Sequence, residues 1–112
     1  MSTVYKIASD YYAENGIRYV FVDGHVCKDI EICYETLQRQ LSIPHYFGRN
    51  LDALEEVLAD LEWVHEKIIK IIILNTTALL VNDVVKKDAL LDILNTCEND
   101  RLEVIYLTGS DL

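Results

Sequence analysis

The run 68–74 (IIKIIIL) restricts the fold more than any other part of the chain, because six of its seven residues are apolar. A strand of this kind, without alternating polar residues, is typical of the middle of a parallel sheet. The run is also far shorter than the roughly 20 apolar residues of a membrane-spanning helix. A second run, 17–22 (IRYVFV), lies between two glycines and is rich in β-branched and aromatic residues. It predicts another strand that is buried on both faces.

Two helical patterns separate these strands. Asp29 suits the N-cap of a helix whose apolar residues continue at helical spacing to Leu41, and Pro44 prevents its continuation. A second, amphipathic helix begins at Asn50, a favourable N-cap residue. The apolar face of this second helix is formed by Leu51, Leu54, Val57, Leu58 and Leu61.

The last third of the chain continues the alternation. Residues 76–77 (TT) can cap a short helical turn, a helix resumes near Lys86 and ends at 99–100 (ND), and a strand covers 102–107. Strands that alternate with helices predict an α/β fold with right-handed crossovers. We expect a single domain, residues 1–112, with a three-stranded parallel sheet packed against three to four helices. Residues 1–16 are an N-terminal extension, in which 9–10 (SD) can open a short helix that ends at 15–16 (NG).

The balance of charge is strongly acidic. The chain has 19 Asp and Glu against 10 Lys and Arg, a net charge of −9. Such a protein repels phosphate backbones, which disfavours direct binding to nucleic acid, and it attracts basic proteins. The alternative is that the charge only keeps the protein soluble.

The sequence offers little to an enzyme hypothesis. The three cysteines, Cys27, Cys33 and Cys97, are an odd number without CxxC spacing, which argues against a disulfide framework and a zinc site. The three histidines lack metal-ligand spacing, and the four glycines form no phosphate-binding loop. Residues 1–10 lack the apolar core of a signal peptide. We therefore expect a reduced, cytoplasmic protein without catalytic activity, cofactor, metal or membrane association.

The segment 52–66 is the most acidic part of the chain, with six carboxylates and no Lys or Arg. The six are Asp52, Glu55, Glu56, Asp60, Glu62 and Glu66. Asp52 and Glu56 lie four residues apart on one helix face, where like charges repel, and Asp60 extends this row. An uncompensated acidic ridge suits a cationic partner, although a solvated helix face is the plainer interpretation.

The loop before this helix favours the binding interpretation. Tyr46 and Phe47 offer rigid apolar area, as interface anchors do, and Gly48 allows the backbone to turn or to approach a partner closely. Burial of the aromatic side chains in the core is the alternative, above all for Phe47.

These residues carry a resemblance to a known family. The segment 43–54 (IPHYFGRNLDAL) resembles the signature of the barstar family: an aromatic pair, a glycine, one variable residue, then Asn-Leu-Asp-Ala-Leu at the start of a helix. The resemblance extends over about residues 17–107 and is strongest over 43–61. It implies the barstar fold and a protein inhibitor whose loop and second helix plug the active site of a basic extracellular ribonuclease.

The resemblance also implies a role for each residue of this segment. Tyr46 would lie against the catalytic histidine of the ribonuclease, and the backbone near Phe47 and Gly48, with Asn50, would line the contact. Asp52 and Glu56 would take the place of substrate phosphates. The expected partner-binding residues are therefore Tyr46, Phe47, Gly48, Asn50, Asp52, Glu55 and Glu56.

Three positions depart from the family pattern. Glu56 stands where an aspartate is usual, Glu55 where a large aromatic residue is common, and Arg49 adds a cation to the acidic surface. We expect a monomer that forms a 1:1 complex with a ribonuclease toxin, as an immunity protein or antitoxin does. The alternatives are a different toxin, such as a DNase, and an interaction domain with no toxin partner.

Overall fold

The computed structural model describes residues 11–108 of the chain. Its strands form one sheet in the order β1-β2-β3-β4. The strands are β1 (Tyr12–Glu14), β2 (Ile17–Asp23), β3 (Ile68–Leu74) and β4 (Leu102–Tyr106). β3 pairs in parallel with both β2 and β4, while β1 pairs antiparallel with β2. The predicted α/β class and the parallel order of the three longer strands are therefore confirmed.

The short strand β1 was not predicted. A two-residue turn, Asn15-Gly16, joins β1 to β2, and both residues have positive φ angles of 56° and 80°. Asn-Gly favours this tight type I′ hairpin turn, because asparagine tolerates a positive φ and glycine adopts it freely. The short helix expected to end at Asn15 and Gly16 is wrong over 12–14, and its start at 9–10 lies outside the described residues.

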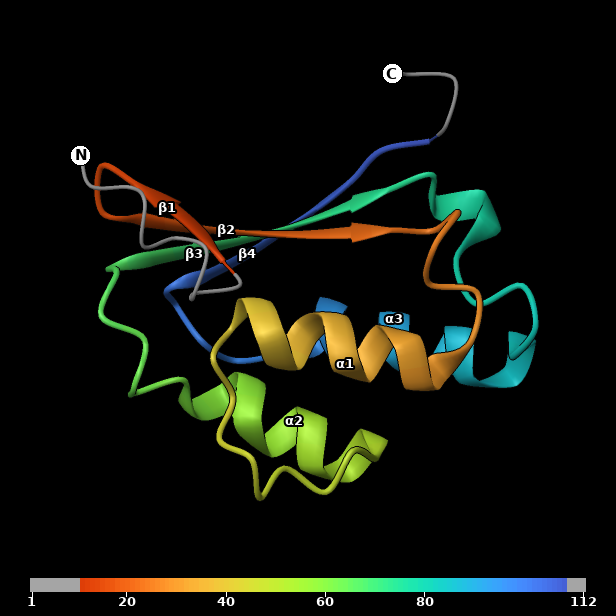
Figure 1. Cartoon of the computed structure of the whole chain (residues 1–112), viewed down its shortest axis with the longest axis horizontal. Helices are drawn as coiled ribbons and strands as arrows, with labels where there is room; N and C mark the ends of the chain where they lie inside the picture. Colours follow the sequence, from red (N-terminus) through yellow and green to blue (C-terminus); the bar gives the residue numbers. More distant parts are fainter. Residues whose placement is uncertain (1–10, 109–112) are drawn as a thin grey trace.

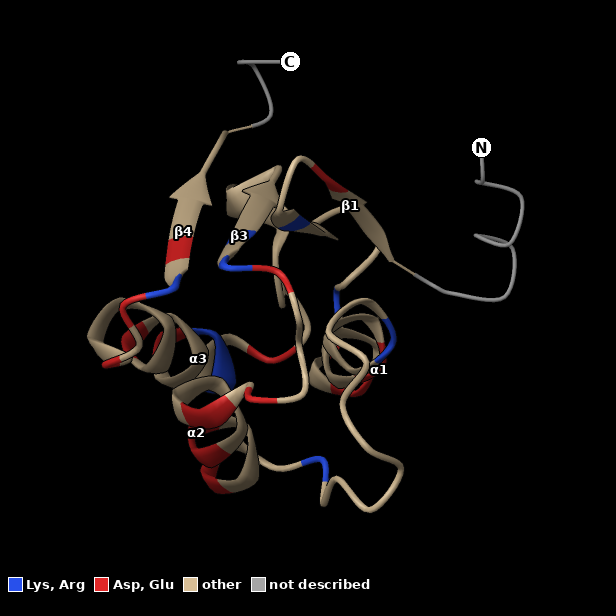
Figure 2. Ribbon diagram, turned by 90° about the vertical axis from the view of Figure 1, so that its left-hand side faces the viewer, with Lys and Arg blue, Asp and Glu red and all other residues tan. Residues whose placement is uncertain are grey.

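All the helices lie on one face of the sheet (Figure 1). They are α1 (Ile30–Gln40), α2 (Leu51–Asp60) and α3 (Val84–Thr96), with a short 3-10 turn, η2 (Thr76–Ala78), after β3. Seen end-on, α1 and α3 lie next to the sheet and α2 lies below them, farthest from the strands (Figure 2). The position of α2 leaves one side of it at the surface of the molecule.

This arrangement corrects the expectation that the two long strands are buried on both faces. Val20 and Ile71 point toward the helices and are completely buried, whereas Phe21 and Ile68, on the opposite face, are 40% and 42% exposed. The apolar residues on the open face are not explained by helix packing. Tyr19 and Phe21 stack there with ring centroids 6.4 Å apart.

The helix boundaries follow the predictions closely, but one cap works differently. The Asp29 side chain does not cap α1 and instead accepts a hydrogen bond from Asn82 Nδ2. The backbone N–H of Ile30 donates to Asp83 Oδ2 over 2.9 Å. A residue from the start of α3 therefore caps α1 and ties the two helices together.

The loops that follow β2 and β3 meet at one edge of the sheet. Asp23 Oδ1 accepts hydrogen bonds from His25 N at 2.9 Å and from Asn75 Nδ2 at 2.8 Å. A Cβ atom on Gly24 would lie 2.1 Å from the carbonyl oxygen of Asn75, so only glycine fits between these loops. No helix within residues 11–108 has the length and apolar content needed to cross a membrane.

Candidate functional site

Helix α2 presents its acids on the surface because its apolar face is fixed against the core. Asn50 caps the helix as predicted, with Oδ1 accepting from Ala53 N over 2.8 Å. Leu54 and Leu58 are completely buried. The opposite side of the helix carries the acidic residues (Figure 2), all of them exposed. These are Asp52, Glu55, Glu56 and Asp60.

The acids on α2 form no ion pair within residues 11–108. Two ion pairs occur within the described residues, Arg18–Glu66 at 2.8 Å and Lys70–Glu103 at 3.8 Å, and neither involves α2. The first pair shows that Glu66 does not belong to the exposed acidic surface, because it neutralises the buried guanidinium of Arg18. The repulsion between α2 carboxylates therefore remains uncompensated in the free protein, at a cost of a few tenths of a kcal/mol per i,i+4 pair.

The loop before α2 separates its two aromatic residues. Phe47 N donates to Pro44 O over 3.0 Å and closes a turn. Tyr46 lies on the outside of this turn and is 78% exposed, whereas Phe47 is only 8% exposed. The Phe47 ring meets Tyr34 edge-on, with centroids 6.1 Å apart. Only the backbone of Phe47 is thus free to contact a partner, and Tyr46 is the exposed aromatic anchor.

Gln38 of α1 holds both ends of this loop. Its Nε2 donates to Pro44 O over 3.2 Å, and its Oε1 accepts from Arg49 Nε over 3.0 Å. Arg49 has a left-handed backbone in this loop, at φ 52°, as does Ser42 at φ 55°, whereas Gly48 does not. A Cβ atom on Gly48 would lie 3.2 Å from Asn50 Nδ2, so the glycine provides space beside the helix cap. The role of Gln38 could not be predicted from the sequence, because its contacts depend on how α1 packs.

Tyr46 and part of the acidic row border one shallow hollow. This hollow of about 150 Å³ lies between the loop and α2, and Glu56, Asp60 and Trp63 contribute to its lining. Trp63 is half-buried, and its Nε1 donates to Leu41 O over 3.0 Å. Trp63 was not among the predicted site residues, although it is the one tryptophan in the chain and lies three residues after the end of α2.

Glu55 faces a different side of α2. It lines a second hollow of about 340 Å³ together with Cys97 and Glu98, which follow α3. Burial raises the pKa of the Cys97 thiol, and the carboxylates of Glu55 and Glu98 raise it further. Glu98 is a further acid beside this helix, and the structure brings it next to Glu55.

Asn50 and Asp52 border a third hollow, at the N-terminal end of α2. The predicted residues therefore lie at three places around α2. Tyr46 and Glu56 lie on one side of the helix, Glu55 lies on another side, and Asn50 and Asp52 lie at its start. No cluster of three or more His, Cys, Asp or Glu side chains suited to a metal ion occurs among the described residues.

Comparisons with known proteins show the family of the chain. The sequence model of the family described as Barstar (barnase inhibitor) matches residues 17–109. A protein of Bacillus subtilis (strain 168) named "Putative ribonuclease inhibitor YrdF" is 40% identical over 48 residues, which is 43% of this chain and 50% of that protein. The match to this relative thus spans half of its length. The family match, in contrast, includes β2 to β4, all three α-helices and the aromatic loop. The chain belongs to the barstar (barnase inhibitor) family.

Proposed function

We propose that this protein inhibits a ribonuclease by covering the active site of the enzyme with α2 and the loop before it. The family and the printed name of the relative support an inhibitor of a ribonuclease. The observation that carries the proposal is the group of exposed α2 acids without an ion-pair partner, next to the exposed ring of Tyr46. The protein itself needs no catalytic group for this role.

The physical basis is mimicry of the RNA backbone. A ribonuclease binds phosphates with Arg, Lys and His side chains, and a carboxylate can accept the same charge-assisted hydrogen bonds. Asp52, Glu56 and Asp60 follow one another at steps of about 6 Å along a rigid helix. Their mutual repulsion is relieved when cations of the enzyme approach, and their field also speeds the encounter.

The remaining residues supply shape and position. Tyr46 offers a rigid aromatic surface, and the hollow between Tyr46, Trp63 and Glu56 can receive a side chain of the partner. Asn50 and Gly48 keep the backbone at the start of α2 close to the surface. In this role the protein would be a monomer when free, form a 1:1 complex, and serve as a cytoplasmic immunity protein or antitoxin.

The test is a titration of the protein into a barnase-type ribonuclease while RNA cleavage is followed at low and high salt. We expect inhibition that is complete at one equivalent and weaker at high salt. The variant Asp52→Ala/Glu56→Ala should lose it. The matched control is Asp88→Ala/Asp92→Ala, which removes two exposed acids with the same spacing from α3. Equal inhibition by both double variants would show that the α2 row is not the inhibitory site.

One observation favours a second candidate, an inhibitor of a DNase or another toxin. Arg49 and Glu55 are exposed on or beside the acidic surface and depart from the family pattern there, which favours a partner other than the usual ribonuclease. A DNase also binds phosphates, so the same acids could serve there. The titration repeated with a basic DNase separates the two: inhibition of the DNase alone would favour this candidate.

A further inference from the structure

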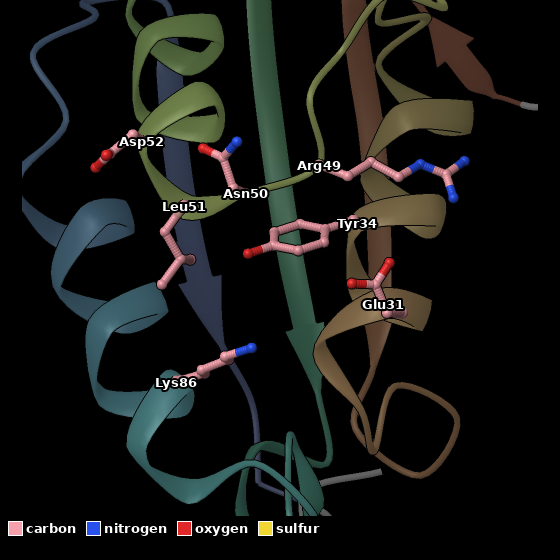
Figure 3. Close-up of a pocket in the computed structure, with 7 residues that line it drawn as sticks. All are labelled: Glu31, Tyr34, Arg49, Asn50, Leu51, Asp52 and Lys86. Carbon is pink, nitrogen blue, oxygen red and sulfur yellow. The ribbon is translucent and has the colours of Figure 1, made fainter.

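A third polar region adjoins the acidic surface, where α2 begins beside α1 and α3. It is a hollow of about 350 Å³. Figure 3 shows Tyr34 reaching across it from α1, with Leu51 and Lys86 on the opposite side. The acids of α2 described above do not explain this region, because Asp52 points away from it (Figure 3).

The hydroxyl of Tyr34 has no hydrogen-bond partner among residues 11–108. The residue is 3% exposed and its ring packs edge-on against Phe47. None of the hydrogen bonds formed by residues 11–108 includes its hydroxyl, which points into the hollow (Figure 3). Buried hydroxyl groups are nearly always paired, so an unpaired one that faces an open space indicates a missing acceptor or donor.

The hydroxyl is suited to donate rather than to accept. Burial raises the pKa of Tyr34, and the carboxylate of Glu31 raises it further. The phenol therefore keeps its proton at neutral pH. Its natural partner is an oxygen that carries negative charge, since such hydrogen bonds are the strong ones.

Two further features of the hollow favour an anion. Lys86 lies in the first turn of α3, where the helix dipole disfavours a cation, and it forms no ion pair within the described chain. Its neighbour Lys87, in contrast, donates to Thr76 O over 2.9 Å. At the start of α2, Asn50 satisfies the amide of Ala53 only, so the first amides of the helix still need an acceptor.

The charges around the hollow limit the ligand. Lys86 is balanced by Glu31, while the side chains of Arg49 and Asp52 point away from the hollow (Figure 3), so the lining has no net charge. The whole chain carries −9. A singly charged group fits this balance, whereas a polyphosphate would meet repulsion from the rest of the protein.

We infer that this hollow, the Tyr34 pocket, is a site for one singly charged oxyanion, held by the Tyr34 hydroxyl, Lys86 and the N-terminal amides of α2. The oxyanion can be a small free anion or the side-chain carboxylate of a bound protein. The second source rests on the proposed function, because the pocket adjoins the α2 surface. It would add a requirement for an acidic residue on the nuclease next to its cationic active site, and so contribute to specificity.

The first experiment needs no nuclease. The 112-residue chain is titrated with acetate and with inorganic phosphate at constant ionic strength, while the backbone amide signals of Leu51 and Asp52 are followed by NMR. We expect saturable shifts that become at least threefold weaker in Tyr34→Phe and in Lys86→Met. Tyr19→Phe and Lys67→Met, which remove a hydroxyl and a charge elsewhere, should bind like the unchanged protein.

The second experiment distinguishes the two sources. The Tyr34→Phe and Lys86→Met variants are compared with the same controls in the inhibition of the ribonuclease. Inhibition weakened threefold or more, with acetate competing, assigns the pocket to a carboxylate of the partner. Unchanged inhibition together with saturable anion binding assigns it to a free anion.

The inference is overturned if neither experiment responds to Tyr34→Phe and Lys86→Met. Anion binding that is equally strong in these variants also overturns it, because the anion then binds elsewhere. If the unchanged protein fails to inhibit any nuclease, the inhibitor proposal fails, but the anion titration still decides whether the pocket is an oxyanion site.

Discussion

The loops after β2 and β3 and the outer side of α2 are both rich in polar groups, but they use them in opposite ways. In the loops, Asp23 accepts two hydrogen bonds, one of them from Asn75, and Gly24 N donates to Leu74 O over 2.7 Å. On α2, the exposed carboxylates have no ion-pair partner within the described residues. The first region satisfies its polar groups internally, and the second leaves them free.

This difference supports the proposed placement of the binding surface on α2. In open α/β sheets the ligand usually lies beyond the carboxyl ends of the strands. Here that edge is closed, because the backbone of Asn75 and Leu79 approaches Gly24 too closely for even a Cβ atom. The closed edge favours the proposed binding at the helical layer, where α2 is the helix farthest from the sheet (Figure 2).

The largest effect should come from reversing the α2 charges. Asp52→Lys/Glu56→Lys should weaken the complex with the ribonuclease by about 4 kcal/mol or more, roughly a thousandfold, since both members of each contact become cationic. The coupling energies known for close charge pairs across interfaces come partly from the barnase–barstar complex, which involves a member of this family. The free energy of unfolding should stay within about 0.5 kcal/mol, as is usual for exposed residues. Titration calorimetry and urea denaturation measure the two quantities.

The control for this reversal is Asp88→Lys/Asp92→Lys on α3, which changes the net charge by the same amount. It should reduce the association rate only moderately and leave the dissociation rate unchanged, because distant charges act mainly on the encounter. Equal losses of affinity in both double variants would mean that net charge, not the α2 row, determines binding.

Substitutions at the closed edge of the sheet should lower the stability of the protein, whereas those on α2 should lower its affinity for the partner. Gly24→Ala should lower the free energy of unfolding by about 3 kcal/mol, because the added Cβ forces two backbone segments apart. Gly48→Ala should cost about 1 kcal/mol or less, since the neighbouring atom is the side-chain nitrogen of Asn50. Urea denaturation of both variants checks this. If Gly24→Ala were as stable as Gly48→Ala, this edge of the sheet would have space for a ligand, and the contrast between a closed edge and an open α2 surface would be wrong.

Asn50 belongs to both structure and surface, so its substitution gives an intermediate effect. Asn50→Ala removes the cap on Ala53 N and should lower the free energy of unfolding by about 1 kcal/mol. Asn50→Asp keeps the capping oxygen and should retain most of the stability. Thermal unfolding of the two variants tests this, and equal melting temperatures for Asn50→Ala and the unchanged protein would contradict the role of the cap.

Much of the fold could be predicted because local patterns determine it. The run 68–74 gives β3, and Asn50 followed by its leucines gives α2 within one residue. Whether helices cover one face of the sheet or both could not be predicted, because the apolar run of a strand is similar in the two cases. The hairpin at Asn15-Gly16 could have been found, since Asn-Gly before a β-rich run is a strong turn signal.

The candidate surface was predictable only in part. Its segment could be chosen from charge and aromatic content, but the environment of each side chain depends on tertiary contacts. Phe47 and Tyr46 are neighbours in sequence, yet one is buried and the other exposed. Glu66 pairs with Arg18, 48 residues away. The unpaired hydroxyl of Tyr34 depends on three helices meeting, which no single segment reveals.

The smallest effect we expect concerns Asp23 and appears only at low pH. Its hydrogen bonds with Asn75 and with the backbone of His25 hold the pKa of the carboxyl below its usual value of 3.8. A lowered pKa in the folded state means that the unfolded state binds protons more readily. The ionised carboxylate therefore stabilises the fold above about pH 4, and this contribution is lost as the pH falls through the folded pKa.

Asp23→Asn cannot ionise, so its free energy of unfolding should fall less between pH 5 and about pH 2. Urea denaturation across this range measures it, with Asp88→Asn as the control for loss of one exposed carboxylate. If both variants followed the pH dependence of the unchanged protein, the ionised form of Asp23 would stabilise the loops no more than the protonated form. The stability of the closed edge would then come from the close packing at Gly24 and not from the charge of Asp23.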